Sequence, residues 1–188
     1  MSTGSNKSSI LAKLTNDITT KVVLLEARQP LLHAVQCWVH DLDDGANLLC
    51  GKSLEEMLCI AWLIRHPDIF TDLLSGEIKR FKKICDGKTC HAQPCSLTQK
   101  ATLDPLIQWA KQQKLLDAKD IPEAEYIRDK RNDHGHAYAM RLYGKSGGTP
   151  SIFGIDPDTK RTIKRTADLV ARVKVRLDAL VPTWKLTP

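Results

Sequence analysis

Apolar residues recur along most of the chain at the three- to four-residue spacing of amphipathic helices. Residues 9–28 show this period, with apolar side chains at Ile10, Leu11, Leu14, Ile18, Val22, Val23 and Leu25. The pattern predicts a helix. We expect Pro30 to kink or restart it, because proline removes a backbone hydrogen bond inside a helix. A second apolar stretch covers residues 31–42, and residues 41–45 are expected to form a turn.

Further helices are expected over residues 48–66, 67–84, 97–116, 120–143 and 158–180. In the first of these, Ser53 and Glu56 have the spacing of an N-terminal capping box. No alternating apolar run predicts a strand, although a short hairpin at 151–155 stays open. The sequence therefore predicts an all-α bundle of about five to seven helices. A length of 188 residues suits a single domain over 1–188, with a core at about 45–143 and a C-terminal helix at about 158–180.

The segment from Arg128 to His136 departs from this amphipathic pattern. Its nine residues include no apolar side chain, although apolar residues flank it on both sides. Since an amphipathic helix normally places an apolar side chain in each turn, this stretch is expected to line a cleft, meet a partner or lie in water. Gly135 within it costs roughly 1 kcal/mol of helix stability relative to alanine. The alternative is a solvated stretch with two incidental histidines.

The residue types and their spacing in this segment point to phosphate chemistry. Asn132 and His136 are four residues apart and share a helix face, while Arg128 and Arg131 lie on adjoining rows. Arginine binds phosphate in a bidentate manner, and histidine transfers protons near neutral pH. These groups suffice to cleave RNA by attack of its own 2′-hydroxyl, because one moves a proton while the other offsets charge growing at phosphorus. We therefore expect a reaction that needs no metal and no cofactor.

At these residues the chain resembles the HEPN superfamily, the higher eukaryotes and prokaryotes nucleotide-binding domains. Its members are small helical bundles marked by an arginine, a polar residue after it and a histidine a few positions on. Arg131, Asn132 and His136 fit the shortest spacing of this motif. Arg128 with His134 also satisfies it, but asparagine is the commoner residue after the arginine. The resemblance covers roughly residues 45–143.

The resemblance implies a metal-independent endoribonuclease of a toxin–antitoxin or anti-phage defence type, working as a homodimer with two motifs facing one cleft. It implies that Arg131 offsets the negative charge of the phosphate, that Asn132 orients His136 or the substrate, and that His136 acts as a general acid or base. The supporting or substrate-binding candidates are Arg128, Lys130, His134 and Tyr138. The implied partners are RNA such as tRNA or mRNA, a second copy, and an antitoxin or regulatory protein. Some members are inactive, so a non-catalytic module that binds RNA, a nucleotide or a protein is the alternative.

Charge and composition agree with a nucleic-acid partner. The net charge is +6, and the isoelectric point is near 9.0, which favours an acidic partner. Aromatic residues make up only 5% of the chain, which argues against a β-sheet platform that stacks RNA bases. The last helix is strongly basic and is expected either to hold RNA backbone or to be a solvated face. Glu55 or Glu56 can pair with Arg128 or Arg131, with surface exposure as the alternative.

Cysteine and histidine residues gather in one expected loop. Cys85, Cys90, His91 and Cys95 lie within eleven residues and form a weak candidate for a structural zinc site, because their spacing is not the usual one of ligand pairs. The alternative to zinc binding is a loop with scattered thiols. If zinc is bound, a further alternative for the whole protein is a purely structural helical bundle with a small zinc loop. Cys37, Cys50 and Cys59 lie in apolar stretches and are expected to be small core residues.

The start of the chain and its apolar runs bear on location. No signal peptide is visible at the N-terminus. The longest apolar run, residues 57–64, is far too short for a membrane span. We therefore expect a cytoplasmic protein with reduced cysteines and no membrane partner.

Overall fold

The computed structural model describes residues 3–65, 103–142 and 156–181, with side chains for 9–65, 103–135 and 156–181. These residues form helices only, and no strand occurs within those ranges. The helices are α1 (Thr3–Lys21), α2 (Leu25–Val39), α3 (Asp43–Ile64), α6 (Leu103–Gln112), α7 (Ile121–Leu142) and α8 (Thr159–Leu180). The prediction of an all-α bundle of about five to seven helices is thus confirmed. The expected helix at 67–84, the cysteine loop and the hairpin at 151–155 lie outside the described residues.

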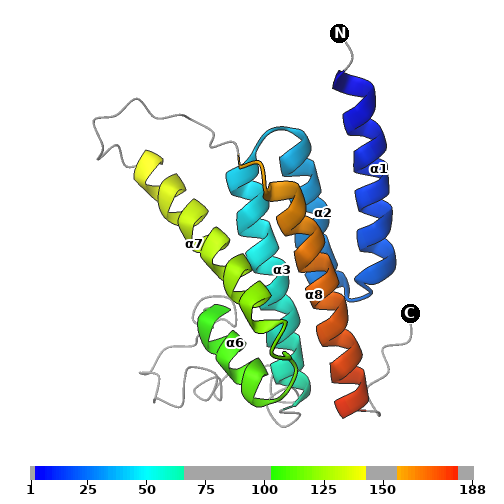
Figure 1. Ribbon diagram of the computed structural model, residues 1–188, viewed down its shortest axis with the longest axis vertical. Helices are drawn as coiled ribbons and strands as arrows, with labels where there is room; N and C mark the ends of the chain where they lie inside the picture. Colours follow the sequence, from blue (N-terminus) through cyan, green and yellow to red (C-terminus); the bar gives the residue numbers. More distant parts are fainter. Residues whose placement is uncertain (1–2, 66–102, 143–155, 182–188) are drawn as a thin grey trace, which may run out of the picture.

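Helix α3 occupies the centre of the bundle. It packs against α2, α6, α7 and α8, while α1 packs against α2 and α8. In Figure 1, α7 and α1 lie on opposite sides, with α3 and α8 between them. Most residues of α3 are buried, including several polar ones. Helix α7, which carries the segment from Arg128 to His136, packs against this central helix.

One apolar cluster joins the six described helices. Each helix contributes at least one side chain that is at most 2% exposed, among them Leu14, Leu31, Leu58, Ile107, Ile127 and Leu169. Burying a side chain of this size contributes about 1.5–3 kcal/mol. The C-terminal helix α8 therefore belongs to the same core as α7.

The first helix ends earlier than the sequence predicts. The break lies between Lys21 and Leu25, whereas Pro30 lies inside α2. Val22 and Leu24 are buried while Val23 between them is 49% exposed. This alternation is that of an extended segment, so burial of both side chains ends α1. Proline in the second turn of α2 removes only one helical hydrogen bond, and the helix does not restart at Pro30, since α2 runs through it.

Helix α3 also begins earlier than predicted. It starts at Asp43, directly after a turn in which Asp41 has a φ of 59°. Ser53 lies ten residues inside it, so the capping-box prediction is wrong. The buried Ser53 hydroxyl instead donates a 2.6 Å hydrogen bond to the carbonyl of Ala27, which fixes α3 against α2.

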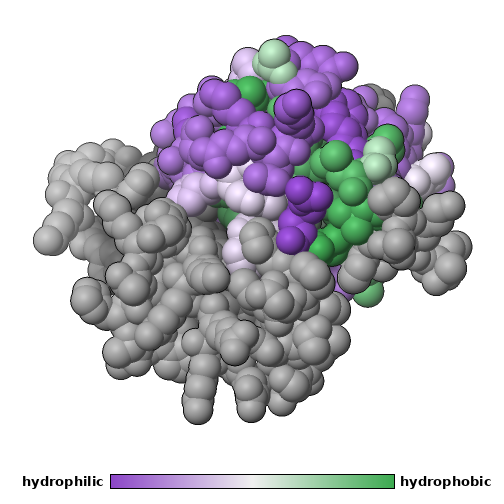
Figure 2. All heavy atoms as spheres, turned by 90° about the horizontal axis from the view of Figure 1, so that it is seen from below, coloured by the Kyte–Doolittle hydropathy of each residue, from purple (hydrophilic) through white to green (hydrophobic). Residues whose placement is uncertain are grey.

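The surface shows isolated apolar side chains among polar ones. Figure 2 views the molecule from the end where α8 finishes and shows a small hydrophobic area beside a mostly hydrophilic one. Large apolar side chains that are exposed within the described residues are Val23, Leu25, Leu42, Val175 and Leu180. Scattered exposure of this kind is ordinary for a folded protein. Within the described ranges, no helix has the length and hydropathy that crossing a membrane requires.

Candidate functional site

The polar middle of α7 meets polar side chains of α3. Arg131 forms an ion pair with Glu55, with 2.8 Å between Nη2 and Oε2. One turn further along α7, His134 contacts Asp44. These contacts explain why this stretch lacks apolar residues, because its polar side chains bind polar side chains of α3 in the same chain.

Arg131 crosses α3 at a position without a side chain. A Cβ atom built on Gly51 would lie 2.4 Å from Arg131 Cδ and 2.7 Å from its Cβ and Cγ. Only glycine permits this approach. The arginine thus passes over Gly51 and reaches Glu55, which follows Gly51 by one turn of α3.

The partner of Arg131 is a deeply buried carboxylate. The Glu55 side chain is 3% exposed, while that of Arg131 is 28% exposed. Lys52 approaches the other oxygen, with 3.3 Å between Nζ and Oε1 of Glu55. Removing one partner of a buried ion pair is costly, because the remaining charge is left unpaired. Glu55 therefore pairs with the guanidinium while the Arg131 side chain as a whole stays partly exposed.

His134 belongs to a second group, the His134 cluster, which comprises Asp44, Asn47, Lys130, His134 and Asp156. The ring nitrogen Nδ1 donates to the Asp44 carboxylate. Nε2 lies 3.1 Å from Asn47 Nδ2 and 3.2 Å from Asp156 Oδ2. An Nε2 without a proton accepts from the Asn47 amide, whereas an Nε2–H donates to the Asp156 carboxylate. The cluster ties α7 to α3 and to the residue that precedes α8.

Lys130 completes this cluster by binding the same Asp156 oxygen that faces His134 and Asn47. Its Nζ lies 2.7 Å from Asp156 Oδ2. Burial alone would raise the pKa of Asp156, but Lys130 and the backbone N–H of Asp158 hold that pKa below its usual value. The Asp156 N–H donates in turn to Asp43, at 2.9 Å. Lys130 is thus engaged within the protein, where the sequence suggested a supporting or substrate-binding residue.

Two further predicted site residues, Asn132 and Arg128, take no part in these two groups. Asn132 is exposed. Arg128 forms ion pairs with Asp104 of α6 and with Asp129. The side chains of His136 and Tyr138 lie outside the described residues, although the α7 backbone continues through both.

The sequence predicts some of these contacts and misses others. The pairing of Glu55 with Arg131, one of the options that the sequence left open, is confirmed. Asp44, Asn47 and Gly51 were not singled out, although with Glu55 they form a stripe at helical spacing on one face of α3. That stripe is a signal that sequence reasoning can use. Asp156 carries no comparable signal.

Cysteines and metal ligands of the described residues form no reactive site. Burial raises the pKa of Cys50 and of Cys59 to about 12, so both thiols stay protonated. Both are buried, as expected of small core residues, whereas Cys37 is only partly buried against the core. No group of three or more His, Cys, Asp or Glu side chains is placed to hold a metal ion in the part of the chain that the structure describes. The candidate zinc ligands of the 85–95 loop lie outside it.

A further buried carboxylate fixes the start of α7. Asp120 is fully buried and lies 2.9 Å from Arg172 Nε and 2.6 Å from Arg176 Nη1, both of α8. It also accepts a hydrogen bond from the N–H of Asp117. Burial favours a higher pKa for Asp120, but these donors hold its pKa below 3.8. The carboxylate thus joins the beginning of α7 to α8.

Replacing Asp120 with asparagine is expected to reduce stability most above pH 4. Because the folded-state pKa lies below the unfolded value, the carboxylate contributes stability above about pH 4. That contribution disappears as the pH falls through the folded-state pKa. Urea unfolding at several pH values should show a loss of about 1–3 kcal/mol at neutral pH that shrinks in acid. Asp168→Asn, at an exposed ion pair with Lys21, is the control and should cost well under about 1 kcal/mol. A loss that does not change with pH would contradict the assignment.

Comparison of the chain with protein-family models, curated proteins and solved structures finds no match. Function is therefore inferred from the residues of the site itself.

Proposed function

We propose that the protein is a metal-independent endoribonuclease of a toxin or anti-phage defence type. The observation that carries this proposal is the placement of Arg131, which a buried carboxylate and a glycine contact hold still while its side chain stays partly exposed. A cation fixed before the substrate arrives stabilises transition-state charge without reorganisation. The proposed substrate is a cytoplasmic RNA such as tRNA or mRNA, and an antitoxin or another partner protein would control the activity.

In the proposed reaction, the 2′-hydroxyl oxygen attacks the adjacent phosphorus and the bond from phosphorus to the 5′ oxygen breaks. One group takes the 2′ proton, and another gives a proton to the leaving 5′ oxygen. Arg131 offsets the charge on the non-bridging oxygens, and His136 transfers one of the protons. Asn132 is exposed and lies one turn before His136 on α7, where it can orient that ring or the substrate. The products are a 2′,3′-cyclic phosphate and a 5′-hydroxyl.

A homodimer supplies what one copy lacks. Each chain carries one Arg131–His136 motif, whereas the reaction needs both an acid and a base. A second motif across a shared cleft would provide the other proton-transferring group. The proposed active form is therefore a dimer.

One observation favours a second function, a non-catalytic module that binds RNA, a nucleotide or a partner protein. Glu55 lies against the guanidinium of Arg131 and offsets part of the positive charge that would act on phosphate. A module of this kind requires the same placement of α7 but no proton transfer. The two functions differ in whether RNA is cut.

The deciding experiment is incubation of the purified protein with tRNA and total RNA in excess EDTA, followed by analysis of the product ends. We expect cleavage to cyclic-phosphate ends by the parent protein and loss of cleavage in Arg131→Ala. Arg65→Ala is the matched control, because Arg65 is exposed at the far end of α3 and bonds only Gln113 in the described part of the chain. Its activity should equal that of the parent. A folded, dimeric parent that cuts no RNA would favour the binding module.

A further inference from the structure

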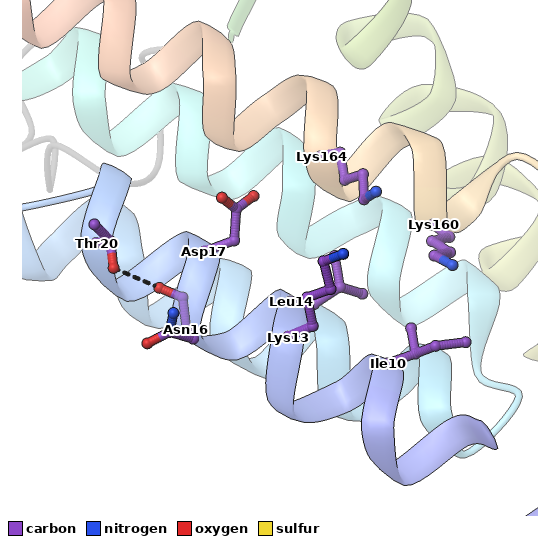
Figure 3. Close-up of a pocket in the computed structure, with 8 residues that line it drawn as sticks. All are labelled: Ile10, Lys13, Leu14, Asn16, Asp17, Thr20, Lys160 and Lys164. Atoms are coloured by element: carbon purple, nitrogen blue, oxygen red, sulfur yellow. Dashed lines mark hydrogen bonds between the residues drawn. The ribbon is translucent and has the colours of Figure 1, made fainter. Parts of the chain in front are cut away.

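A groove lies between α1 and α8, on the side of α8 away from α7 (Figures 1 and 3). Its volume is about 580 Å³. Ile10 and Leu14 provide apolar lining, and three lysines stand along it: Lys13 on α1, and Lys160 and Lys164 on α8. In Figure 3 these lysines come from both walls of the groove. We call it the α1–α8 groove.

The three lysines keep their positive charge available. Among the described residues, none of the three forms an ion pair with a carboxylate; Lys160 only lies 5.7 Å from the centroid of the Trp38 ring. The one acidic residue of the groove, Asp17, pairs with Lys21, which also binds Asp168. The local charge of the groove is therefore positive.

Four of the five other basic residues of α8 differ in this respect. Arg165, Arg172, Lys174 and Arg176 form ion pairs with acidic residues of the protein, and the fifth, Arg161, is exposed and does not line the groove. The basic residues of this helix thus include two groups. Those with acidic partners stabilise the fold, and those that face α1 are left for an anionic partner.

We propose that the α1–α8 groove holds the phosphate backbone of single-stranded RNA. The α1 residues that line it run from 10 to 20, which corresponds to roughly 15 Å of helix, so an extended polyanion suits it better than a compact ligand. Lysine is a mobile point charge that follows phosphates without reading bases. No aromatic ring is among the lining residues, so the contacts do not select a base. The choice of RNA as the polyanion rests on the proposed function.

The first turn of α8 links the groove to the site on α7. Thr159 accepts a hydrogen bond from Asn47 of the His134 cluster, at 3.2 Å, and Lys160 follows it directly. Lys160 is therefore one residue along the chain from a contact of the cluster that anchors α7, although the groove lies on the other side of α8. The groove would serve to retain RNA on the protein.

The test measures binding of a 2′-O-methyl RNA of about 20 nucleotides, longer than one binding site, by fluorescence anisotropy over a range of salt. This RNA has no free 2′-hydroxyl, so it cannot be cut by the proposed reaction. We expect the triple variant Lys13→Gln, Lys160→Gln, Lys164→Gln to bind about tenfold more weakly near 0.1 M salt. We also expect its salt slope to fall by about 2, at roughly 0.7 for each lost phosphate contact.

The matched control carries the same change of charge elsewhere. Lys111, Lys114 and Lys119 are exposed residues of α6 and the following turn, and their triple change to glutamine should leave binding within about twofold of the parent. Both variants should unfold at the temperature of the parent protein.

Three results would overturn the groove proposal: no binding by the parent, equal binding by the parent and the groove variant, or stronger binding of a polyglutamate peptide than of RNA. The last result would assign the groove to an acidic protein. Because binding is measured without cleavage, the two proposals fail separately. An uncut RNA substrate with intact groove binding removes only the nuclease proposal, whereas cleavage with unaffected groove variants removes only the groove.

Discussion

Replacing Gly51 with alanine is expected to push α7 away from α3 at Arg131 and to abolish RNA cleavage. In most helix interiors this change stabilises a protein by about 1 kcal/mol. Here the new Cβ would lie 2.4 Å from Arg131 Cδ and 2.7 Å from its Cβ. A Cβ atom is fixed to the backbone, so a rotamer change cannot relieve the whole contact. Overpacking costs typically about 1–3 kcal/mol, which exceeds the gain from helix propensity.

Gly45→Ala is the matched control for this prediction, since it lies on the same helix. Its Cβ would meet only the Cys37 side chain, at 3.3 Å from Sγ. We expect a small change in the unfolding free energy of this variant and unchanged cleavage. The double variant Gly51→Ala, Arg131→Ala should lose less stability than the sum of the two single losses, because two of the three close contacts disappear. If Gly51→Ala unfolds like Gly45→Ala in urea, the packing of Arg131 on α3 is not as described.

The fold was predictable where local signals agree with burial. The expected helices at 120–143 and 158–180 match α7 and α8 within one residue at each end, because turn residues bound each amphipathic run. The break before α2 is not marked by a local signal, because the one helix-breaking residue nearby is Pro30, which lies inside α2. Val22 and Leu24 both reach the core, and only the packed bundle reveals that this requires an extended segment.

The candidate site was predictable in part, for a similar reason. Arg131 and Glu55 could be suggested as partners because both stand out on helices expected to pack together. Asp156 could not, since its contact with His134 depends on where α8 begins in space. Sequence spacing alone does not distinguish the roles of His134 and His136, because each follows an arginine at a spacing that the motif allows. The structure instead gives His134 a set of buried partners, and that difference leads to the last prediction.

We expect His134→Ala to lower stability with little effect on cleavage, and His136→Ala to lower cleavage with little effect on stability. The His134 side chain is 15% exposed and lies between Asp44 and Asp156, which are 11% and 9% exposed. Its removal takes one contact from each of these two carboxylates and breaks a link between α7 and α3, at about 1–3 kcal/mol of unfolding free energy. Replacing His136, the proposed proton-transferring group, should lower the cleavage rate about 100-fold or more. Its loss should leave the urea midpoint nearly unchanged.

The double variant Asp44→Asn, His134→Ala distinguishes a structural network from two independent contacts. Because the two residues contact each other, the unfolding free energy of the double variant should be higher than the sum of the single losses predicts. Cleavage by His134→Ala, measured well below its melting temperature, should remain close to that of the parent. If His134→Ala is instead as stable as the parent and inactive, the proton-transferring role belongs to His134. The motif would then be Arg128 with His134, and its ion pairs with Asp104 and Asp44 would be contacts that substrate binding has to break.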